Sequence, residues 1–594
     1  MKKDIRDRIL KLRNFMELNN IDAFIVPSTD AHSGEYIPEY WESRKWISGF
    51  TGSAGTVVIT RDKAGLWTDS RYFIQAEEQL KDTGIILFKD KLPETPTVDE
   101  WIYNVIAPGS TVGIDGWVNS ASAINSLRDK LKVKNIVIKC VQDPFIDIWK
   151  ERPSLPLNEI FIHDLKFSGM ECEVKIDIIR ENLKKNEMQS ILISALDEIA
   201  WTLNLRGNDV HCNPVFVSYL LITSTEVSLY IIDKKLTPQV REYLRKNNIN
   251  IKSYFSLEED LKNLSAENFP IQISPNINEA VNEILEGKSH TILSPVLFLK
   301  SIKNDVEIHG FRNAMLRDGV AMVKFLHWIK YAVKNGNESE LSITDKLLEF
   351  RTEQDNFIGI SFDTIAGYRE HGAIVHYEAD EESNKELKPE GMILLDSGAQ
   401  YLDGTTDITR TIILGDITQE EKRDYTLVLK GMINLSMAEF PYGTCGTQLD
   451  VLARMPMWKY GINYMHGTGH GVGCCLNVHE GPHQFRMNHM PALLLPGMTI
   501  TNEPGIYKAG RYGIRTENTM LIVRSKSTEF GEFYKFSPLT LCPIDKEGID
   551  VELLSTEEIK WLNDYHQSVY DKISPLVDND IEEWLKEATS PLIK

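Results

Sequence analysis

Two segments of this sequence carry acidic residues where β-strands are expected. Residues 394–411 read LLDSGAQYLDGTTDITRT and place Asp396 and Asp407 inside apolar, β-prone stretches. Aspartate is disfavoured in strands, and an unpaired buried carboxylate is costly. Asp403 needs no such explanation, because Asp-Gly is common in turns. The other two aspartates need a partner, and a bound cation would be one.

A four-residue loop, 400–403, would place Asp396 directly across the hairpin from Asp407. Their Cβ atoms would then be about 4.5–5.5 Å apart. Like charges at that distance repel unless a cation lies between them. A two-residue turn at Asp403 and Gly404 would break this register, and two solvent-facing aspartates are the alternative interpretation.

A second segment repeats the pattern. Residues 498–523 read MTITNEPGIYKAGRYGIRTENTMLIV, and Glu503 and Glu517 each follow an apolar strand segment. An odd-length loop centred near Gly510 would put these two glutamates face to face. Oxygen-rich ligand sets suit hard cations such as Mn²⁺ or Mg²⁺. Four carboxylates can hold two such ions about 3.5–4 Å apart, as in two-metal hydrolases.

Histidines gather in the same part of the chain. The run HGTGHGVG contains His466 and His470, and its glycines allow unusual backbone angles and close approach. A lone histidine is more often an ordinary polar contact than a ligand, but the clustering of most of the fourteen histidines argues against that interpretation for all of them. Imidazole is the nitrogen ligand or proton carrier expected beside such a site. Two nearby runs, NVHEGPH and REHGAIVHYEA, add His479, His483, His371 and His376.

The bulk composition excludes several classes of function. The chain has 594 residues, with 65 basic against 86 acidic side chains and a net charge of −21, which argues against nucleic-acid binding. No apolar run reaches the roughly 20 residues that span a bilayer. The first 20 residues predict a charged amphipathic helix without a signal-peptide pattern. The seven cysteines contain no C-x-x-C pair, so free thiols are expected. We therefore expect a cytoplasmic protein that binds neither nucleic acid nor membrane.

The elements that must position the site follow three unlike stretches. The first, to about residue 145, alternates helices and strands, beginning with a helix over 3–19, and a proline-rich linker follows at 151–161. The second, about 162–305, repeats the order of the first: Asp30, Thr60 and Asp69 correspond to Asp197, Thr223 and Asp233 at offsets of 167, 163 and 164 residues. Near-constant offsets indicate a duplication, although α/β units also resemble one another by chance.

The third stretch differs in style. A helix over 305–332 precedes glycine-rich hairpins, and two amphipathic helices follow residue 545. The predicted domains are therefore 1–150, 151–305 and 306–594, the last with a C-terminal extension at about 545–594.

The order of the five candidate ligands resembles that of the pita-bread metallopeptidases, which include methionine aminopeptidase, prolidase and aminopeptidase P. The segments AIVHY, DSGAQYLDGTTDITRT, HGTGHGVG, LNVHEGP, NEPGIY and GIRTEN, together with GFTGSAGTVVIT and WTDSRYFIQA, are similar to the three-domain Xaa-Pro aminopeptidase family over essentially the whole chain. The resemblance implies an α/β (α+β) fold: two duplicated creatinase-like N-terminal α/β domains, a pita-bread catalytic domain and a C-terminal helical extension.

The resemblance also implies a role for each ligand. Asp396 and Asp407 would bind two divalent ions, with Asp407 bridging them. Mn²⁺ is the first candidate for these ions. His470 and Glu503 would hold one ion, and Glu517 would bridge both. A hydroxide between the ions would be the nucleophile, and Glu503 would also carry its proton.

Five further residues have implied roles around the substrate. By the resemblance, three histidines contact substrate and stabilise the tetrahedral intermediate: His376, His466 and His479. Arg71 of WTDSRYF matches a substrate-binding arginine. Arg515 of GIRTEN is expected near the substrate, paired with Glu503 or Asp407 as support for the ligands.

The implied reaction removes the N-terminal residue from peptides whose second residue is proline, in a homodimeric enzyme. Three alternatives have distinct signatures. A prolidase would cleave only dipeptides, a metal-free peptide- or histone-binding relative would lack ligands, and a creatine amidinohydrolase would lack the carboxylate set. All five ligands stand in this sequence.

Overall fold

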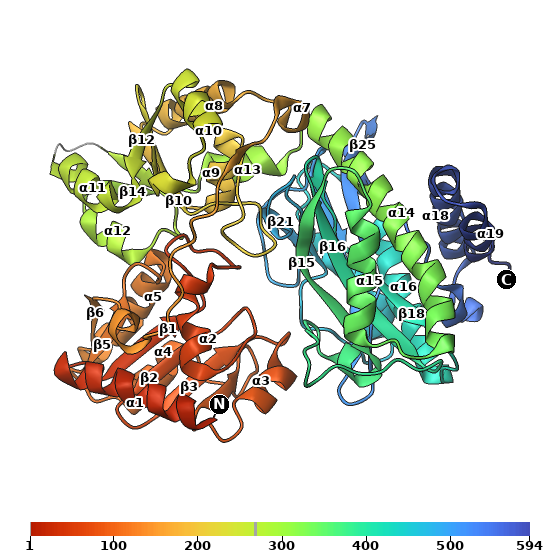
Figure 1. Ribbon diagram of the computed structural model, residues 1–594, viewed down its shortest axis with the longest axis horizontal. Helices are drawn as coiled ribbons and strands as arrows, with labels where there is room; N and C mark the ends of the chain where they lie inside the picture. The colour runs from red at the N-terminus through yellow and green to blue at the C-terminus, as the bar shows by residue number, and fades with distance from the viewer. Residues whose placement is uncertain (1, 267–269) are drawn as a thin grey trace. The chain divides into compact units, whose positions relative to one another are not determined.

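The computed structural model describes residues 2–266 and 270–594 (Figure 1). The chain forms two compact units. The N-terminal unit contains residues 1–163 and 170–296, and the C-terminal unit contains residues 164–169 and 297–594. Each unit has its own sheets and hydrophobic cores.

The first half of the N-terminal unit is a mixed six-stranded sheet in the order β4-β3-β2-β1-β5-β6. Helix α1 (Lys2–Leu18) packs on it through Ile5, Ile9, Leu12 and Met16, the three- and four-residue spacing of an amphipathic helix. The strands are β1 (Ala23–Pro27), β2 (Thr56–Thr60), β3 (Ala64–Thr68), β4 (Ile86–Lys89), β5 (Thr111–Asp115) and β6 (Val137–Val141), and the remaining helices are α2 (Ser43–Ser48), α3 (Phe73–Gln79), α4 (Val98–Val105), α5 (Ala121–Leu131) and α6 (Phe145–Ile148).

The second half repeats this sheet strand for strand, in the order β12-β11-β10-β8-β13-β14. In each sheet the first strand pairs antiparallel with the second and parallel with the fifth. Ala23 lies opposite Thr60 in one sheet, and Ser190 lies opposite Thr223 in the other. The predicted duplication, with its offsets of 167 and 163 residues, is confirmed by this shared register.

The elements of the second half alternate as those of the first do. Its strands and helices are α8 (Cys172–Lys185), β8 (Ser190–Ile193), α9 (Leu196–Leu203), β10 (Ser218–Thr223), β11 (Val227–Ile231), α10 (Pro238–Lys246), β12 (Ile249–Ser253), α11 (Leu257–Ala266), β13 (Ile271–Ile273), α12 (Glu279–Ile284), β14 (Ser289–Thr291) and α13 (Pro295–Ser301), with β7 (Phe161–Ile162) paired to β9 (Leu205–Arg206).

Two antiparallel sheets form the centre of the C-terminal unit. One has the order β15-β16-β17, with β18 also pairing β16, and the other has the order β19-β26-β25-β22-β20-β21. A two-stranded ribbon, β23-β24, continues from the second sheet. The strands are β15 (Phe357–Tyr368), β16 (Met392–Tyr401), β17 (Gly404–Thr405), β18 (Ile408–Ile413), β19 (Glu439–Pro441), β20 (Gly469–Gly471), β21 (Glu480–Phe485), β22 (Thr499–Asn502), β23 (Gly505–Lys508), β24 (Tyr512–Arg515), β25 (Asn518–Thr528) and β26 (Gly531–Pro538).

Long helices cover these sheets (Figure 1). The predicted helix at 305–332 is α14 (Asp305–Asn335), which begins at a capping box between Asn304 and Glu307 and ends before Gly336. The other long helices are α15 (Glu340–Thr352), α16 (Gln419–Ser436), α17 (Gly446–Trp458), α18 (Thr556–Ile573) and α19 (Asn579–Ala588), and the unit also contains the single-turn helix α7 (Leu165–Ser168).

The C-terminal extension shares a core with the rest of the C-terminal unit. Leu562, Tyr565 and Val569 of α18 belong to one hydrophobic cluster with Leu427 and Val428 of α16. The two predicted C-terminal amphipathic helices are confirmed as α18 and α19.

The seven cysteines all lie in the described part of the chain and are free thiols, as expected. Among the described residues, no helix combines the length and the apolar character needed to cross a bilayer.

Candidate active site

The hairpin of β16 and β18 carries Asp396 and Asp407, but not in the predicted register. Asp396 lies opposite Thr409, so the prediction that it faces Asp407 directly is wrong. The pairing of Tyr401 with Gly404 leaves a two-residue turn at 402–403 instead of a four-residue loop. Because side chains alternate along a strand, Asp407 and Thr409 still share a face. Asp396 and Asp407 are therefore diagonal neighbours, and each raises the electrostatic energy of the other.

The second pair is positioned as predicted. The ladder of β22 with β25 sets Asn502 opposite Asn518, and the ribbon of β23 with β24 sets Gly505 opposite Arg515. Both ladders have the same register, which places Glu503 opposite Glu517 between them. The connecting loop has three residues and contains Gly510 at φ +69°, a left-handed conformation that glycine adopts readily.

His470 joins the two hairpins from β20. Its Nε2 atom lies 3.4 Å from Asp407 Oδ2 and 3.4 Å from Glu503 Oε1. Ligand atoms of Asp407, His470 and Glu517 all lie within 4.8 Å of one another. His470 Nδ1 donates to the Gly471 carbonyl at 2.9 Å, which leaves Nε2 as the nitrogen that faces the carboxylates and that would bind a metal ion after losing its proton.

The five groups differ in exposure. The side chains of His470 and Glu503 are 14% and 17% exposed, whereas Glu517 is 1% exposed. His470 and Glu503 thus form the open side of the site, and Glu517 forms its floor.

The electrostatics of the site favour bound cations. Burial, reinforced by Asp407 and Glu503 and opposed by Arg515, raises the pKa of Asp396 to about 7. Burial and the charges of Asp407, Glu503 and Asp396 raise the pKa of Glu517 well above its usual range. Burial lowers the pKa of His470, but the neighbouring carboxylates outweigh it and raise that pKa to about 9. Two divalent ions would remove this repulsion.

Two buried oxygens give independent support for cations. Asp396 Oδ1 and Glu517 Oε1 are buried without a hydrogen-bond partner. A buried carboxylate oxygen without a partner is costly, and a metal ion is a natural partner for it. The donor set of four carboxylates and one imidazole therefore fits hard divalent ions.

Arg515 pairs with Asp396 and not with the predicted partners, Glu503 or Asp407. Its Nη2 and Nε atoms donate to Asp396 Oδ2 at 2.6 and 3.1 Å. The register explains this choice. Asp396 lies opposite Thr409, and Arg515 Nε also donates to Thr409 Oγ1 at 3.2 Å, so Arg515 contacts both members of this cross-strand pair. Arg515 thus supports a candidate ligand, as expected, but a different one.

Tyr507 and Thr409 are site residues that the sequence analysis missed. Arg515 Nη1 donates to Tyr507 Oη at 2.8 Å, and that oxygen lies 2.8 Å from His466 Nε2. His466 Nδ1 donates to the Gly467 carbonyl at 2.7 Å, so in the neutral form of the ring Nε2 accepts from Tyr507. Thr409 Oγ1 donates to Glu517 Oε2 at 2.7 Å. The spacing of two residues from Asp407 to Thr409 is the signal that points to Thr409.

The structure brings the other predicted histidines near the ligands in two ways. The ring of His479 stands edge-on to His470 with centroids 4.3 Å apart. His376 is partly buried and follows Val375, whose carbonyl accepts from Arg515 Nη2 at 3.3 Å. The remaining two histidines have internal partners: His371 Nδ1 lies 2.9 Å from Glu340, and His483 Nε2 lies 2.8 Å from the Thr499 carbonyl.

The loop of His376 approaches the β24 strand without intervening side chains. A Cβ atom at Gly513 would lie 1.6 Å from the Gly372 carbonyl oxygen. Only glycine at 513 therefore allows this contact, which holds the loop against the strand that ends in Arg515.

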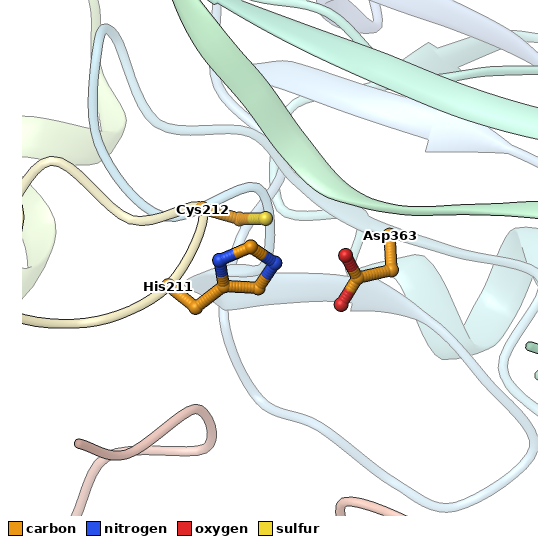
Figure 2. Close-up of side chains that lie close together, drawn as sticks. All are labelled: His211, Cys212 and Asp363. Carbon is orange, nitrogen blue, oxygen red and sulfur yellow. The ribbon is translucent and has the colours of Figure 1, made fainter. Parts of the chain in front are cut away.

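Arg71 lies in the N-terminal unit. It forms a bidentate pair with Asp69, at 2.9 and 2.8 Å, and lies 3.5 Å from Glu35. Its role toward a substrate stays a prediction. His211 and Cys212, in the loop before β10, belong to the same unit, whereas Asp363 belongs to β15 (Figure 2). The candidate active site includes none of these three residues.

Comparison with known families covers nearly the whole chain. Two models described as the Creatinase/Prolidase N-terminal domain match residues 8–140 and 151–307. The model of metallopeptidase family M24 matches residues 309–524, and that of the C-terminal region of peptidase M24 matches residues 532–592.

Individual relatives agree with these models. The chain is 42% identical to aminopeptidase P2 of Arabidopsis thaliana, over 97% of this chain and 86% of that protein. It is 41% identical to Xaa-Pro aminopeptidase 1 of Dictyostelium discoideum, over 99% and 97%. Among solved structures, it resembles an X-prolyl aminopeptidase of Caenorhabditis elegans with a TM-score of 0.95 and 35% identity, over 99% of this chain and 100% of that one. That protein is described as a cytosolic enzyme with a di-nuclear active site.

Proposed function

The chain belongs to metallopeptidase family M24, in its aminopeptidase P branch, and on this premise we propose how its residues carry out the reaction. It is an Xaa-Pro aminopeptidase with a di-nuclear metal site, built as two creatinase-like domains followed by a pita-bread catalytic domain. The observation that carries the residue assignment is the convergence of two hairpins and His470 on one buried cluster of ligand atoms.

Three of the five proposed ligands, Asp407, His470 and Glu517, form that cluster, Glu503 lies 3.4 Å from His470, and Asp396 is close enough to interact electrostatically with Asp407 and Glu503. The oxygen-rich set suits Mn²⁺. When bound, divalent ions supply Lewis acidity and make water a nucleophile near neutral pH. Asp407 and Glu517 would hold the ions together with His470, because they come from different hairpins and their ligand atoms lie within 4.8 Å of one another and of His470.

Glu503 is the proposed proton carrier. Its side chain is the most exposed of the four carboxylates, and the neighbouring His470 is also partly exposed. Burial raises the pKa of Glu503, and His470 and Arg515 oppose that effect. A carboxylate with a raised pKa can take a proton from the attacking water and deliver it to the departing prolyl nitrogen.

The X-Pro bond sets the requirement for substrate contacts. Proline has no backbone N–H, so a dedicated pocket must recognise this amide without that donor. We assign His376 and His479 as donors to the oxygen that becomes negative during attack. His466 is proposed to contact substrate as well, which requires exchange of its bond with Tyr507 or Gly467. Arg71 and Arg515 complete the proposed substrate-binding set.

Three further properties are part of the proposal. The protein acts in the cytosol, because the worm relative is described as cytosolic. It forms a homodimer, and its partners are peptides with proline in second position, not nucleic acid or membrane. The proposed domains are 1–150, 151–305 and 306–594, with the C-terminal extension at about 545–594; the family models at 8–140, 151–307 and 309–524 support the first boundaries, whereas the model of the C-terminal region begins earlier, at 532.

The test is hydrolysis of Xaa-Pro, Xaa-Pro-Pro and longer peptides by the chelated protein, with and without added Mn²⁺. We expect cleavage of the tripeptide and longer substrates only with metal. Cleavage of the dipeptide alone would instead identify a prolidase, and failure of the protein to bind metal would identify a binding module. Asp407→Asn serves as the inactive reference, because it should lose metal and hydrolysis together.

A second variant tests the histidine assignment. His376→Ala should keep both metal ions and lower kcat, by about 10²–10³-fold for loss of an oxyanion donor. Measured metal content separates this outcome from a metal-loss phenotype. An unchanged kcat would remove His376 from the catalytic set.

A further inference from the structure

We propose that Arg410 and Tyr565 are positioning residues for Glu517, so that the C-terminal extension sets the geometry of the metal site. This inference rests on the proposed role of Glu517 as a ligand. It concerns a connection from helix α18 to the floor of the site.

Glu517 is held at three points by two neighbouring residues of β18. Its N–H donates to the Thr409 carbonyl at 3.1 Å. Its carbonyl accepts from Arg410 Nη1 at 2.6 Å, and its carboxylate accepts from Thr409 Oγ1 at 2.7 Å. Main chain and side chain of Glu517 are therefore both fixed by the Thr409–Arg410 pair.

Arg410 depends in turn on the segment that follows β26. Its guanidinium is buried, and its acceptors are all neutral groups. A buried guanidinium gains no solvation to replace a missing acceptor, so each hydrogen bond determines its orientation. Besides Glu517, the acceptors are the carbonyls of Thr409, Cys542 and Pro543 at 2.9, 2.8 and 3.0 Å, Asn518 Oδ1 at 2.9 Å and Tyr565 Oη at 3.0 Å.

Tyr565 is the member of this set that comes from the extension. Its hydroxyl lies within hydrogen-bond distance of the carbonyls of Thr540 and Cys542, at 3.1 and 2.9 Å. Its ring is buried and stacks on Trp561 with centroids 5.3 Å apart. The phenol therefore lies in a fixed place, where it accepts from Arg410 and ties the 540–543 segment to the same point.

A change at Tyr565 is expected to reach Glu517 through Arg410. Loss of the Tyr565 hydroxyl removes one of the three acceptors that surround the two N–H groups of Arg410 Nη2, and it removes the donor to the Thr540 and Cys542 carbonyls, so the buried position of the guanidinium is less well defined. Arg410 then shifts or admits water, and the carbonyl of Glu517 loses its fixed donor. The Glu517 carboxylate lies on the same residue, so its alignment toward bound metal ions would relax while the proposed ligand itself stays present.

The experiment compares Tyr565→Phe with Tyr570→Phe in the full-length, metal-free protein. Tyr570 is on the same helix, and its hydroxyl donates to Glu582 at 2.9 Å, within the extension. Mn²⁺ alone is titrated into each variant in competition with a chelator. We expect about tenfold weaker Mn²⁺ binding for Tyr565→Phe, the lower end of the effect of removing an outer hydrogen-bond partner, and wild-type affinity for Tyr570→Phe.

Arg410→Lys extends the test, because it keeps the charge but loses the fork that reaches both Glu517 and Tyr565. Its affinity should fall further, by about 10–100-fold. Hydrogen exchange gives a readout without metal: the Glu517 amide should exchange faster in Tyr565→Phe than in Tyr570→Phe. A purely structural role for Tyr565 would lower the thermal stability of Tyr565→Phe but leave its Mn²⁺ affinity and Glu517 exchange equal to those of Tyr570→Phe.

The outcomes separate this inference from the proposed function. Equal Mn²⁺ affinity and equal Glu517 exchange in Tyr565→Phe and wild type would overturn the inference while the enzyme assignment stands. A wild-type protein that binds no Mn²⁺ would overturn the metal-site assignment itself, whatever the exchange data show.

Discussion

The two hairpins that supply the carboxylates differ in how their negative charges are arranged and balanced. Glu503 and Glu517 stand directly opposite each other, at the junction of two ladders with one register. Asp396 and Asp407 are diagonal neighbours, and Asp396 has Arg515 as a counter-charge. Glu517 has only the Thr409 hydroxyl on one oxygen and no partner on the other.

This difference shows that a carboxylate pair need not be balanced within its own hairpin. Asp396 of the aspartate hairpin pairs with Arg515, which lies on β24 of the glutamate hairpin. Glu517, on the floor of the site, receives no such charge and depends more strongly on bound ions. The following predictions test this asymmetry, beginning with the largest expected effect.

Glu517→Gln should remove the least compensated carboxylate. We expect loss of one or both metal ions and a fall in hydrolysis of an Xaa-Pro peptide greater than about 100-fold, because a lost ligand exceeds a lost outer partner. Metal content and kcat/KM check this expectation. Glu532→Gln, at an exposed position of β26, is the matched control and should behave as wild type. A Glu517→Gln enzyme with two ions and the wild-type rate would contradict the assignment.

In the metal-free protein, neutralising the two hairpins should change stability by different amounts. Asp396→Asn relieves the burial of a carboxylate but also removes the counter-charge of Arg515, so its two effects oppose each other. Glu517→Gln instead relieves repulsion from three neighbouring acids and should raise the free energy of unfolding. Denaturant unfolding after chelation measures both. Destabilisation of equal size by the two variants would remove the asymmetry.

The affinity for Mn²⁺ should increase with pH. The pKa of Asp396 in the metal-free fold is about 7, above its ordinary 3.8, so a proton competes with metal at and below neutrality. The sign for stability is the reverse: the folded state binds this proton more tightly, so the metal-free protein loses stability as pH rises from about 4 to about 7.

Chelator-buffered Mn²⁺ titrations at several pH values measure the first effect. Affinity should change by up to about tenfold per pH unit for each proton displaced. Asp396→Asn removes one titrating group and should flatten the curve, whereas an unchanged curve would assign the proton to another residue.

Thr409→Val should give the smallest effect. The hydroxyl donates to Glu517 and accepts from Arg515, so it links the aspartate hairpin to two residues of the glutamate hairpin, beside the stronger Arg515–Asp396 pair. We expect about tenfold weaker metal binding with the fold intact. Thr405→Val, which loses a bond to Gln400 on the same hairpin, is the control. Equal affinities for the two variants would show that the link is dispensable.

The sequence predicts more about the glutamate hairpin than about the aspartate hairpin for a physical reason. Gly510 at the centre of a three-residue loop fixes the register from within the segment. In the aspartate hairpin, the residues around Asp403 are compatible with both a four-residue loop and a two-residue turn, and the packing of the strands decides between them. The structure places the turn at 402–403.

Long-range partners were the least predictable feature. Arg515 was identified, but its choice of Asp396 depends on how the ribbon of β23 and β24 lies against β16, which no local pattern specifies. Tyr507 could not be identified from the sequence, because a tyrosine within a strand is common and most often serves only in packing. The duplicated sheets were predictable, because each repeats a whole series of strands in the same order.

The close approach of Gly513 to Gly372 has a genetic consequence. A single added methyl group at 513 would push the loop that carries His376 away from β24, while the ligands on other strands keep their places. Gly513→Ala is thus expected to be a separation-of-function allele: a protein that accumulates and loads metal in the cell yet turns over peptide poorly, more so at high growth temperature. Selection for suppressors of such an allele would map which substitutions let that loop return.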